Sequence, residues 1–139
     1  MDDEIKKWNY DTVNGIGFYR KYTGHYSHIE LEISKSLDEY KRNRIKYSID
    51  ENQLPKEFRI EIEETLSFFL SYLKAVIPEE YGLVFNIIDG TYHPIDTKRT
   101  DFQIATILAL SNCFGKNIKP IKEKEIEIIN KLKNDLLKK

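Results

Sequence analysis

The sequence predicts an α+β fold in which two helices cover one face of a mainly antiparallel sheet. Ile29, Leu31 and Ile33 alternate with polar residues, and a period of two is typical of a half-buried strand. Apolar residues recur at helical spacing over residues 58–73, which indicates an amphipathic helix. The apolar run 83–88 predicts a buried strand, and an apolar helical stretch follows it. The resulting order is strand, strand, strand, helix, strand, helix.

Three strands are expected in the first half of the chain. The first covers residues 12–22, and its glycines are consistent with a kink. In the second strand, Glu30 and Glu32 point away from the apolar side chains, so one sheet face is expected to be acidic and solvated. The charged residues 38–44 predict a turn, after which residues 45–49 alternate again in a third strand.

The second half begins with a long helix. Pro55 occupies a tolerated position in its first turn, and Pro78 ends it. The fourth strand is expected over residues 81–88. Thr100 and Asp101 can then cap the second helix, because short polar side chains satisfy the free backbone N–H groups at a helix start.

A terminal helix follows the second helix, which ends near Phe114 with Gly115 as a suitable stop. Residues 121–139 carry apolar side chains at helical spacing between lysines and glutamates, which predicts an amphipathic helix. The side chains that form this apolar stripe are Ile126, Ile129, Leu132 and Leu136. We expect the stripe to pack back on the domain, with a partner protein as the alternative occupant.

The composition fits one globular domain. The chain has 139 residues, of which 40% are hydrophobic and 32% charged, enough for a single sizeable core. Its net charge is −1, so nucleic-acid binding would need a local basic patch. The single cysteine, Cys113, excludes an internal disulfide, and its apolar neighbours favour a buried structural thiol. Without a signal peptide or an apolar run of roughly 20 residues, we expect a cytoplasmic protein that contacts no membrane.

The most informative segment is residues 89–102, DGTYHPIDTKRTDF, between the fourth strand and the second helix. It contains an Asp-Gly turn signal, an aromatic residue, a histidine, a proline and two adjacent cations. The segment resembles the tip of domain IV of elongation factor G, the ribosomal translocase. The positions that match the family are Asp89, Gly90, Tyr92, His93, Asp96 and Phe102, with Thr91 in place of Ser and Ile95 in place of Val.

Two further segments carry the same resemblance, in the family's order. Residues 24–33 resemble the Gly-Gln-Tyr-Gly-His-Val start of a family strand, and residues 53–58 resemble the Val-Pro opening of the family's long first helix. The resemblance implies a four-stranded sheet with a left-handed βαβ crossover, an exception to the usual right-handed rule. The expected organisation is an N-terminal extension, 1–11, a domain like elongation factor G domain IV, 12–115, and a terminal-helix segment, 116–139.

The resemblance implies a non-enzymatic domain that binds the small ribosomal subunit or its RNA and modulates translation. Tyr92 can stack on a base or ribose, and His93 can donate a hydrogen bond to a phosphate or a 2′-hydroxyl. Lys98 and Arg99 can neutralise phosphates. The chain has no Gly-x-x-x-x-Gly-Lys-(Ser/Thr) phosphate loop, so we expect no GTP hydrolysis.

A second group of candidate RNA-binding residues comes from the other tip loop of the family. Arg20, Lys21 and Tyr22 precede the strand that matches this loop, and we expect them to lie beside His93. The family's glycine-rich basic loop is shorter here, which weakens the match at this point.

Two other function classes compete with RNA binding. The segment 89–102 can be a purely structural loop, and the chain an intracellular inhibitor or immunity-type module that binds protein through its acidic sheet face or terminal helix. An enzyme has less support, because His25 and His28 point to opposite faces of a regular strand and chelate a metal poorly. His28 fits a structural role better. No nucleophile motif accompanies His93, so we expect no catalytic residue, metal, cofactor or DNA partner.

Overall fold

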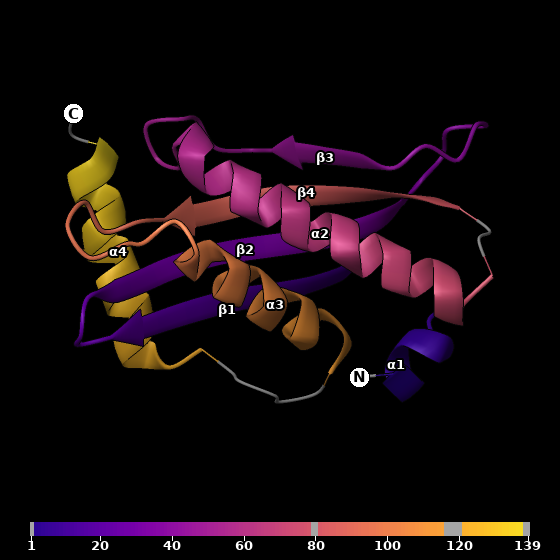
Figure 1. The fold of residues 1–139 in the computed structure, drawn as a ribbon, viewed down its shortest axis with the longest axis horizontal. Helices are drawn as coiled ribbons and strands as arrows, with labels where there is room; N and C mark the ends of the chain where they lie inside the picture. The colour runs from indigo at the N-terminus through magenta and orange to yellow at the C-terminus, as the bar shows by residue number, and fades with distance from the viewer. Residues whose placement is uncertain (1, 79–80, 116–120, 138–139) are drawn as a thin grey trace.

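The computed structural model describes residues 2–78, 81–115 and 121–137 (Figure 1). Its elements follow the predicted order, with one short helix added before the first strand. They are α1 (Asp2–Lys6), β1 (Val13–Lys21), β2 (His25–Ser36), β3 (Arg44–Tyr47), α2 (Lys56–Val76), β4 (Gly82–Thr91), α3 (Asp101–Phe114) and α4 (Glu123–Leu137). The predicted boundary at residue 116 and the predicted end of the terminal helix, 138–139, lie outside the described residues.

A four-stranded sheet of order β1-β2-β4-β3 forms the centre of the fold. β2 is antiparallel to both β1 and β4, whereas β3 is parallel to β4. Because α2 connects these two parallel strands, β3, α2 and β4 form a βαβ unit. In Figure 1 the chain leaves β3, crosses in front of the sheet through α2 and enters β4 in the left-handed sense. The α+β class, the mainly antiparallel sheet and the left-handed crossover are confirmed.

The main core lies between the sheet and the helices α2 and α3, which run side by side over one face (Figure 1). Both periodic patterns of the sequence are confirmed there, because the alternating strand residues and the helical stripe meet in this layer. The buried strand residues are Ile29, Leu31, Ile33, Leu83, Phe85 and Ile87. The buried residues of the α2 stripe are Phe58, Ile62, Leu66, Phe69 and Leu73.

Helix α3 approaches β1 so closely that only glycine fits between them. A Cβ atom at Gly17 would lie 1.8 Å from the carbonyl oxygen of Ala105, and one at Gly15 would lie 2.1 Å from that of Ala109. Glycine is used where backbones must come this close. The two glycines therefore set the distance between the helix layer and the edge of the sheet.

Strand β4 continues past its predicted end at Ile88. Residues 89–91 stay paired with β2, and the register between the two strands shifts next to Glu30, which marks a bulge. The expectation of a turn at Asp89-Gly90 is therefore wrong: Ile88 is left out of the pairing at the bulge, and Asp89 and Gly90 pair with Glu30 and Ile29 inside the strand. A Cβ atom at Gly90 would lie 3.2 Å from the carbonyl oxygen of His28, so glycine also permits the close strand contact.

Helix α4 lies against the opposite face of the sheet. Ile129 is buried against Phe18 and Tyr26, whose side chains point away from α3. Glu30 and Glu32 lie on this second face and are only half-exposed, so the acidic face is less solvated than the sequence predicts.

The residues before β1 also join the core. Ile5 of α1 is fully buried, and the ring of Trp8 packs edge-on against that of Phe114 with centroids 5.0 Å apart. The hydroxyl of Tyr10 donates a hydrogen bond of 2.6 Å to the carbonyl oxygen of Pro78. These contacts attach the predicted extension to the ends of α2 and α3.

We predict that Gly17→Ala destabilises the fold. The added methyl overlaps the carbonyl of Ala105, so α3 must move away from β1, and overpacking of this kind lowers the free energy of unfolding by about 1–3 kcal/mol. Urea unfolding followed by circular dichroism measures the change. Asn14→Ala is the matched control on the exposed side of the same strand, and we expect a change within about 0.5 kcal/mol. Equal stability of the two variants would contradict the close contact.

Candidate nucleic-acid interface

Two loops from distant parts of the sequence meet at one end of the sheet. The turn between β1 and β2, residues 22–24, lies beside the segment between β4 and α3, residues 92–100, which we call the tip loop (left side of Figure 1). Gly24 has a φ of 95°, a backbone conformation that glycine adopts without strain. The ammonium nitrogen of Lys98 lies 3.9 Å from the place where a Cβ of Gly24 would be. The two segments that the sequence resemblance pairs are therefore neighbours.

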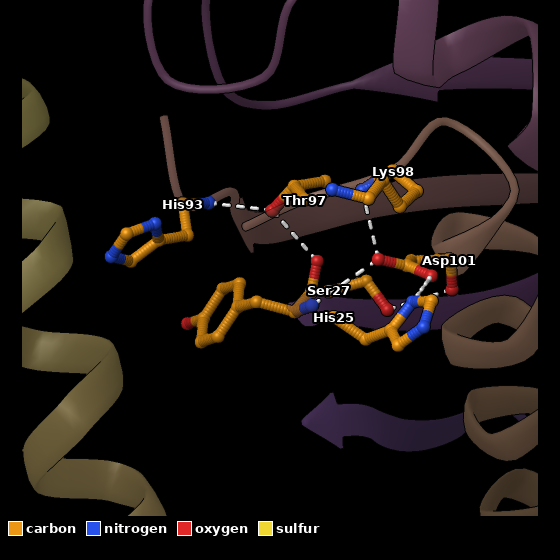
Figure 2. A network of polar contacts seen from close by, with 7 residues as sticks. His25, Ser27, His93, Thr97, Lys98 and Asp101 are labelled. Atoms are coloured by element: carbon orange, nitrogen blue, oxygen red, sulfur yellow. Dashed lines mark hydrogen bonds and ion pairs between the residues drawn. The ribbon is translucent and has the colours of Figure 1, made fainter. Parts of the chain in front are cut away.

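The carboxylate of Asp101 joins the two loops (Figure 2). Asp101 is only 2% exposed, and its Oδ2 accepts hydrogen bonds from the backbone N–H groups of Lys98 at 2.8 Å and Tyr26 at 3.2 Å. Its Oδ1 lies 2.8 Å from Nδ1 of His25. Because a carboxylate only accepts, His25 carries a proton on Nδ1. The hydroxyl of Ser27 adds a 2.7 Å hydrogen bond to the backbone carbonyl of Asp101.

The predicted cap of α3 takes a different form. Thr100 occupies the N-cap position, but it has helical backbone angles and its side chain makes no capping hydrogen bond. The carboxylate of Asp101 binds an amide before the helix and an amide of β2, instead of the free amides of the first helical turn. Its hydrogen bonds consequently stabilise the loops around the helix start.

Thr97 attaches the middle of the tip loop to β2. Its Oγ1 donates a hydrogen bond of 2.7 Å to the backbone carbonyl of Tyr26 and accepts one of 2.7 Å from the backbone N–H of His93 (Figure 2). The backbone N–H of Thr97 donates back to the carbonyl of His93 at 3.1 Å. Asp101 and Thr97 thus hold the loop to the same strand at two points.

The imidazole of His93 is held in one tautomer by the tip loop. Its Nδ1 accepts hydrogen bonds from the backbone N–H groups of Ile95 at 3.2 Å and Asp96 at 3.0 Å. Nδ1 is also 3.7 Å from a carboxylate oxygen of Asp96, but an ion pair there would need a proton on Nδ1 and would break both amide bonds. In this arrangement Nδ1 is occupied as an acceptor, so the ring offers a donor on Nε2. Within the tip loop, His93 is therefore the acceptor for these two backbone amides.

The structure separates the predicted aromatic and cationic residues. Tyr92 turns inward, with its ring centroid 5.3 Å from that of Phe58, whereas Tyr22 is 92% exposed. The guanidinium Nε of Arg99 lies 3.1 Å from Oε1 of Glu61 on α2, so this cation is already paired. Tyr22 is consequently the predicted aromatic residue best placed to contact a ligand.

The remaining predicted residues gather around the β1–β2 turn. Arg20 and Lys21 are exposed, and the guanidinium carbon of Arg20 lies 5.2 Å from the ring centroid of Tyr22. Lys98 approaches the turn from the tip loop. The ring of His93, whose side chain is one-third exposed, lies further along β2, with its centroid 6.4 Å from that of Tyr26. We call this group of five residues the tip surface: Arg20, Lys21, Tyr22, His93 and Lys98.

Sequence reasoning missed the residues that position the tip surface. Asp101 was expected only as a helix cap, and Thr97 and His25 had no expected role in the loops. Lys122 and Lys124 of the terminal segment also line a groove beside Arg20. An Asp at a helix start and lysines in an amphipathic helix are common, so their sequence pattern does not indicate these positions.

A buried polar cluster lies on the face covered by α4. His28 is 2% exposed, and its Nδ1 lies 3.0 Å from Oγ1 of Thr91, which is 2.6 Å from the hydroxyl of Tyr26. The structural role expected of His28 is therefore confirmed. Burial lowers the pKa of His28 from 6.5 to about 4, and Asp89 opposes this shift. Burial and the neighbouring charge of Asp89 raise the pKa of Glu30.

Asp89 connects this cluster to both helical layers. Its carboxylate forms an ion pair with Lys133 of α4 and accepts a hydrogen bond of 2.7 Å from the side-chain amide of Gln53, just before α2. Asp89, which matches the elongation factor G pattern, therefore has structural partners in this fold.

The described residues offer no arrangement suited to catalysis by Cys113 or to metal binding. Burial raises the pKa of Cys113 to about 12, so its thiol is protonated at neutral pH. Across residues 2–78, 81–115 and 121–137, His, Cys, Asp and Glu side chains form no group that could hold a metal ion. Over the same ranges, no helix combines the length and apolar character needed to cross a membrane.

Comparison with known proteins identifies the fold and goes no further. No protein-family model matches the chain. The crystal structure of a protein from Thermus thermophilus matches 75% of the chain with a TM-score of 0.57 and 22% sequence identity. The match covers 16% of that protein, so the chain spans about one-sixth of its length. At this identity the likeness shows a shared α+β fold and leaves function to be argued from the site.

We predict that Asp101→Ala loosens both loops. Removal of the carboxylate leaves the amides of Tyr26 and Lys98 without their acceptor, and a buried unpaired donor costs about 1–3 kcal/mol. The free energy of unfolding should fall by about that amount, and amide hydrogen exchange should accelerate at residues 26 and 98. Asp96→Ala, in the same loop but half-exposed, is the control. Unchanged exchange in Asp101→Ala would contradict the role of this carboxylate.

We predict that stability falls as the pH drops from 6.5 to about 4. Unfolded His28 binds a proton near pH 6.5, but the folded residue does so only near pH 4. The unfolded chain therefore binds more protons in this window, which destabilises the fold by up to about 3 kcal/mol. Glu30 acts in the opposite direction, because its raised folded pKa makes stability fall as the pH rises through it.

The measurement is urea unfolding at several pH values for the wild type and for His28→Gln, which cannot titrate. Carboxylates remote from His28 contribute equally to both curves and cancel in the difference. The wild type should lose more stability than the variant on acidification. Parallel curves would show that His28 is not kept neutral by burial.

Proposed function

We propose that this chain binds RNA of the small ribosomal subunit through the tip surface and catalyses no reaction. The observation that carries the proposal is the gathering of Arg20, Lys21 and Lys98 with an exposed Tyr22 at one end of the sheet. A local cluster of cations attracts phosphate even when the whole chain carries a net charge of −1.

The chemistry of the tip surface suits unpaired RNA. Arg20, Lys21 and Lys98 can neutralise phosphates. Tyr22 has a solvent-exposed ring on which a base can stack, and such stacking is a common contact to unpaired bases. The Nε2–H of His93 can donate to a phosphate or to a 2′-hydroxyl. Cations, a stacking ring and a directional donor together favour RNA over a simple anion.

The rigidity of the tip loop supports the same function. Its backbone is fixed to β2 through Thr97 and Asp101, so little conformational entropy is lost when a ligand binds. The match of residues 89–102 to the tip of elongation factor G domain IV gives the proposal its specific partner, the small ribosomal subunit. Two of the predicted RNA-binding residues contribute less than expected, since Tyr92 faces the core and Arg99 is paired with Glu61.

A second candidate function is protein binding at an apolar groove between α2 and α3. Phe68 is 75% exposed and Ile107 is 51% exposed, and both line this groove. Exposed apolar patches of this kind often mark protein-binding sites. This location differs from the two expected for an inhibitor or immunity-type module, the acidic sheet face and the terminal helix, because α4 packs with Ile129 on the sheet.

We predict that the wild-type chain co-sediments with purified small ribosomal subunits in a salt-dependent manner and that Arg20→Ala, Lys21→Ala, Lys98→Ala together weaken this binding. Each lost phosphate contact should make the slope of log K against log salt shallower by about 0.7. The slope of the triple variant should therefore be shallower than that of the wild type by about 2. The measurement is binding over a salt series with the protein quantified in the pellet.

The matched control is a second triple variant, Lys46→Ala, Lys56→Ala, Lys74→Ala, which removes the same charge from exposed positions outside the tip surface. It should bind as the wild type does. If both triple variants lost the same affinity, binding would depend on the net charge of the chain and not on the tip surface. If the wild type did not bind at low salt, the proposed function would be refuted.

A further inference from the structure

The groove beside the β1–β2 turn, which we call the hairpin groove, has features that the tip surface alone does not explain. It is formed by β1, the turn and the start of α4, and its lining residues are Phe18, Arg20, Tyr22, Lys122, Lys124, Glu125 and Ile128. The resemblance to elongation factor G ends before α4, so the α4 side of this groove has no family counterpart. We propose that the hairpin groove binds one unpaired RNA nucleotide, an inference that rests on the proposed function. The first turn of α4 is then part of the RNA-binding surface.

The floor of the groove is apolar and its walls are basic. Phe18 is 5% exposed and packs against Ile129, with Ile128 alongside it, so the floor continues the small core beneath α4. Arg20 stands on the wall from β1, and Lys122 and Lys124 stand on the wall from α4. An apolar floor between cations matches a nucleotide, which presents an apolar base face and a charged phosphate.

The electrostatics of the groove favour an anion. Three of its lining residues are cationic and one, Glu125, is acidic. The carboxylate of Glu125 accepts a hydrogen bond of 2.9 Å from the backbone N–H of Lys122, so it caps the start of α4. The free N–H groups at the start of this 15-residue helix add partial positive charge beside the lysines. The phosphate is therefore expected on the α4 side of the groove.

Tyr22 determines where the base is expected. Its ring is 92% exposed, and Arg20 approaches the ring at 5.2 Å. A base that stacks on the open face of this ring would place its phosphate toward Lys122 and Lys124. The same turn meets Lys98 from the tip loop on its other side, so a strand that passes the turn meets cations on both sides.

Helix α4 is held firmly enough to present these lysines. Ile129 is buried against Phe18 and Tyr26, and Lys133, further along the helix, forms an ion pair with Asp89. The position of the first turn relative to Arg20 is therefore set by contacts that do not involve Lys122 or Lys124.

The test compares the Lys124→Glu and Lys131→Glu variants. Fluorescence anisotropy measures the affinity of each for a fluorescein-labelled oligouridine strand. Both lysines are exposed on α4, and only Lys124 lines the groove. A glutamate in the first turn of a helix is favourable, so Lys124→Glu should not unfold α4. We expect Lys124→Glu to bind roughly tenfold more weakly with a salt slope lower by about 0.7, and Lys131→Glu to bind like the wild type.

The stacking contact has its own pair of variants. Tyr22→Ala should weaken binding about tenfold, whereas Tyr22→Phe, which keeps the ring, should not. Polyglutamate of comparable charge, added as a competitor, distinguishes RNA from an acidic peptide. Equal competition by polyglutamate, or unchanged binding by Tyr22→Ala, would overturn the nucleotide assignment.

The outcomes separate this inference from the proposed function. If the wild type and Lys124→Glu co-sediment equally with small ribosomal subunits and bind the strand equally, the groove assignment fails while the proposed function stands. If the wild type binds neither the subunits nor the strand, both fail. Loss in Lys124→Glu and Tyr22→Ala, with retention in Lys131→Glu and Tyr22→Phe, supports the groove.

Discussion

The arrangement of the candidate interface depends on one buried carboxylate, that of Asp101. A buried charge is costly unless it is fully hydrogen-bonded, and this one has three partners: two backbone amides and the imidazole of His25. The amides belong to the tip loop and to β2, so the carboxylate connects segments that lie about half the chain apart. Together with the Thr97 hydroxyl, it fixes the position of Lys98 relative to the β1–β2 turn.

The position of Asp101 depends in turn on the contact between α3 and β1. Gly15 and Gly17 let the backbone of α3 lie directly on the strand, which brings the first residue of the helix to the start of β2. Close packing of a helix on a sheet thus fixes the geometry of two loops. Loops that carry binding residues on a rigid scaffold are common, and here the scaffold includes the amide contacts of the loop itself.

The sequence predicts the elements well because each periodic pattern reports a local property, burial on one face. It predicts the tip loop less well because the bulge at Ile88 depends on pairing with β2, and the turn signal of the Asp-Gly pair that follows is overridden. Once β4 runs on to Thr91, whose hydroxyl faces His28, the next side chain, Tyr92, falls on the helix side against Phe58. An extended strand therefore explains why Tyr22, and not Tyr92, is the aromatic residue that this end of the sheet exposes.

The positions of α2 and α4 on the sheet determine how far the cationic residues extend around the tip surface. No local sequence pattern specifies where a helix packs. On the α2 side the surface ends at Arg99, whose charge is paired with Glu61. On the other side of the hairpin, α4 docks through Ile129 and places Lys122 and Lys124 beside Arg20. In the sequence, these lysines are typical of the solvated face of an amphipathic helix. In the fold, they line the same groove as the exposed ring of Tyr22. A chain with a net charge of −1 can in this way offer a basic, ring-containing surface at a single end.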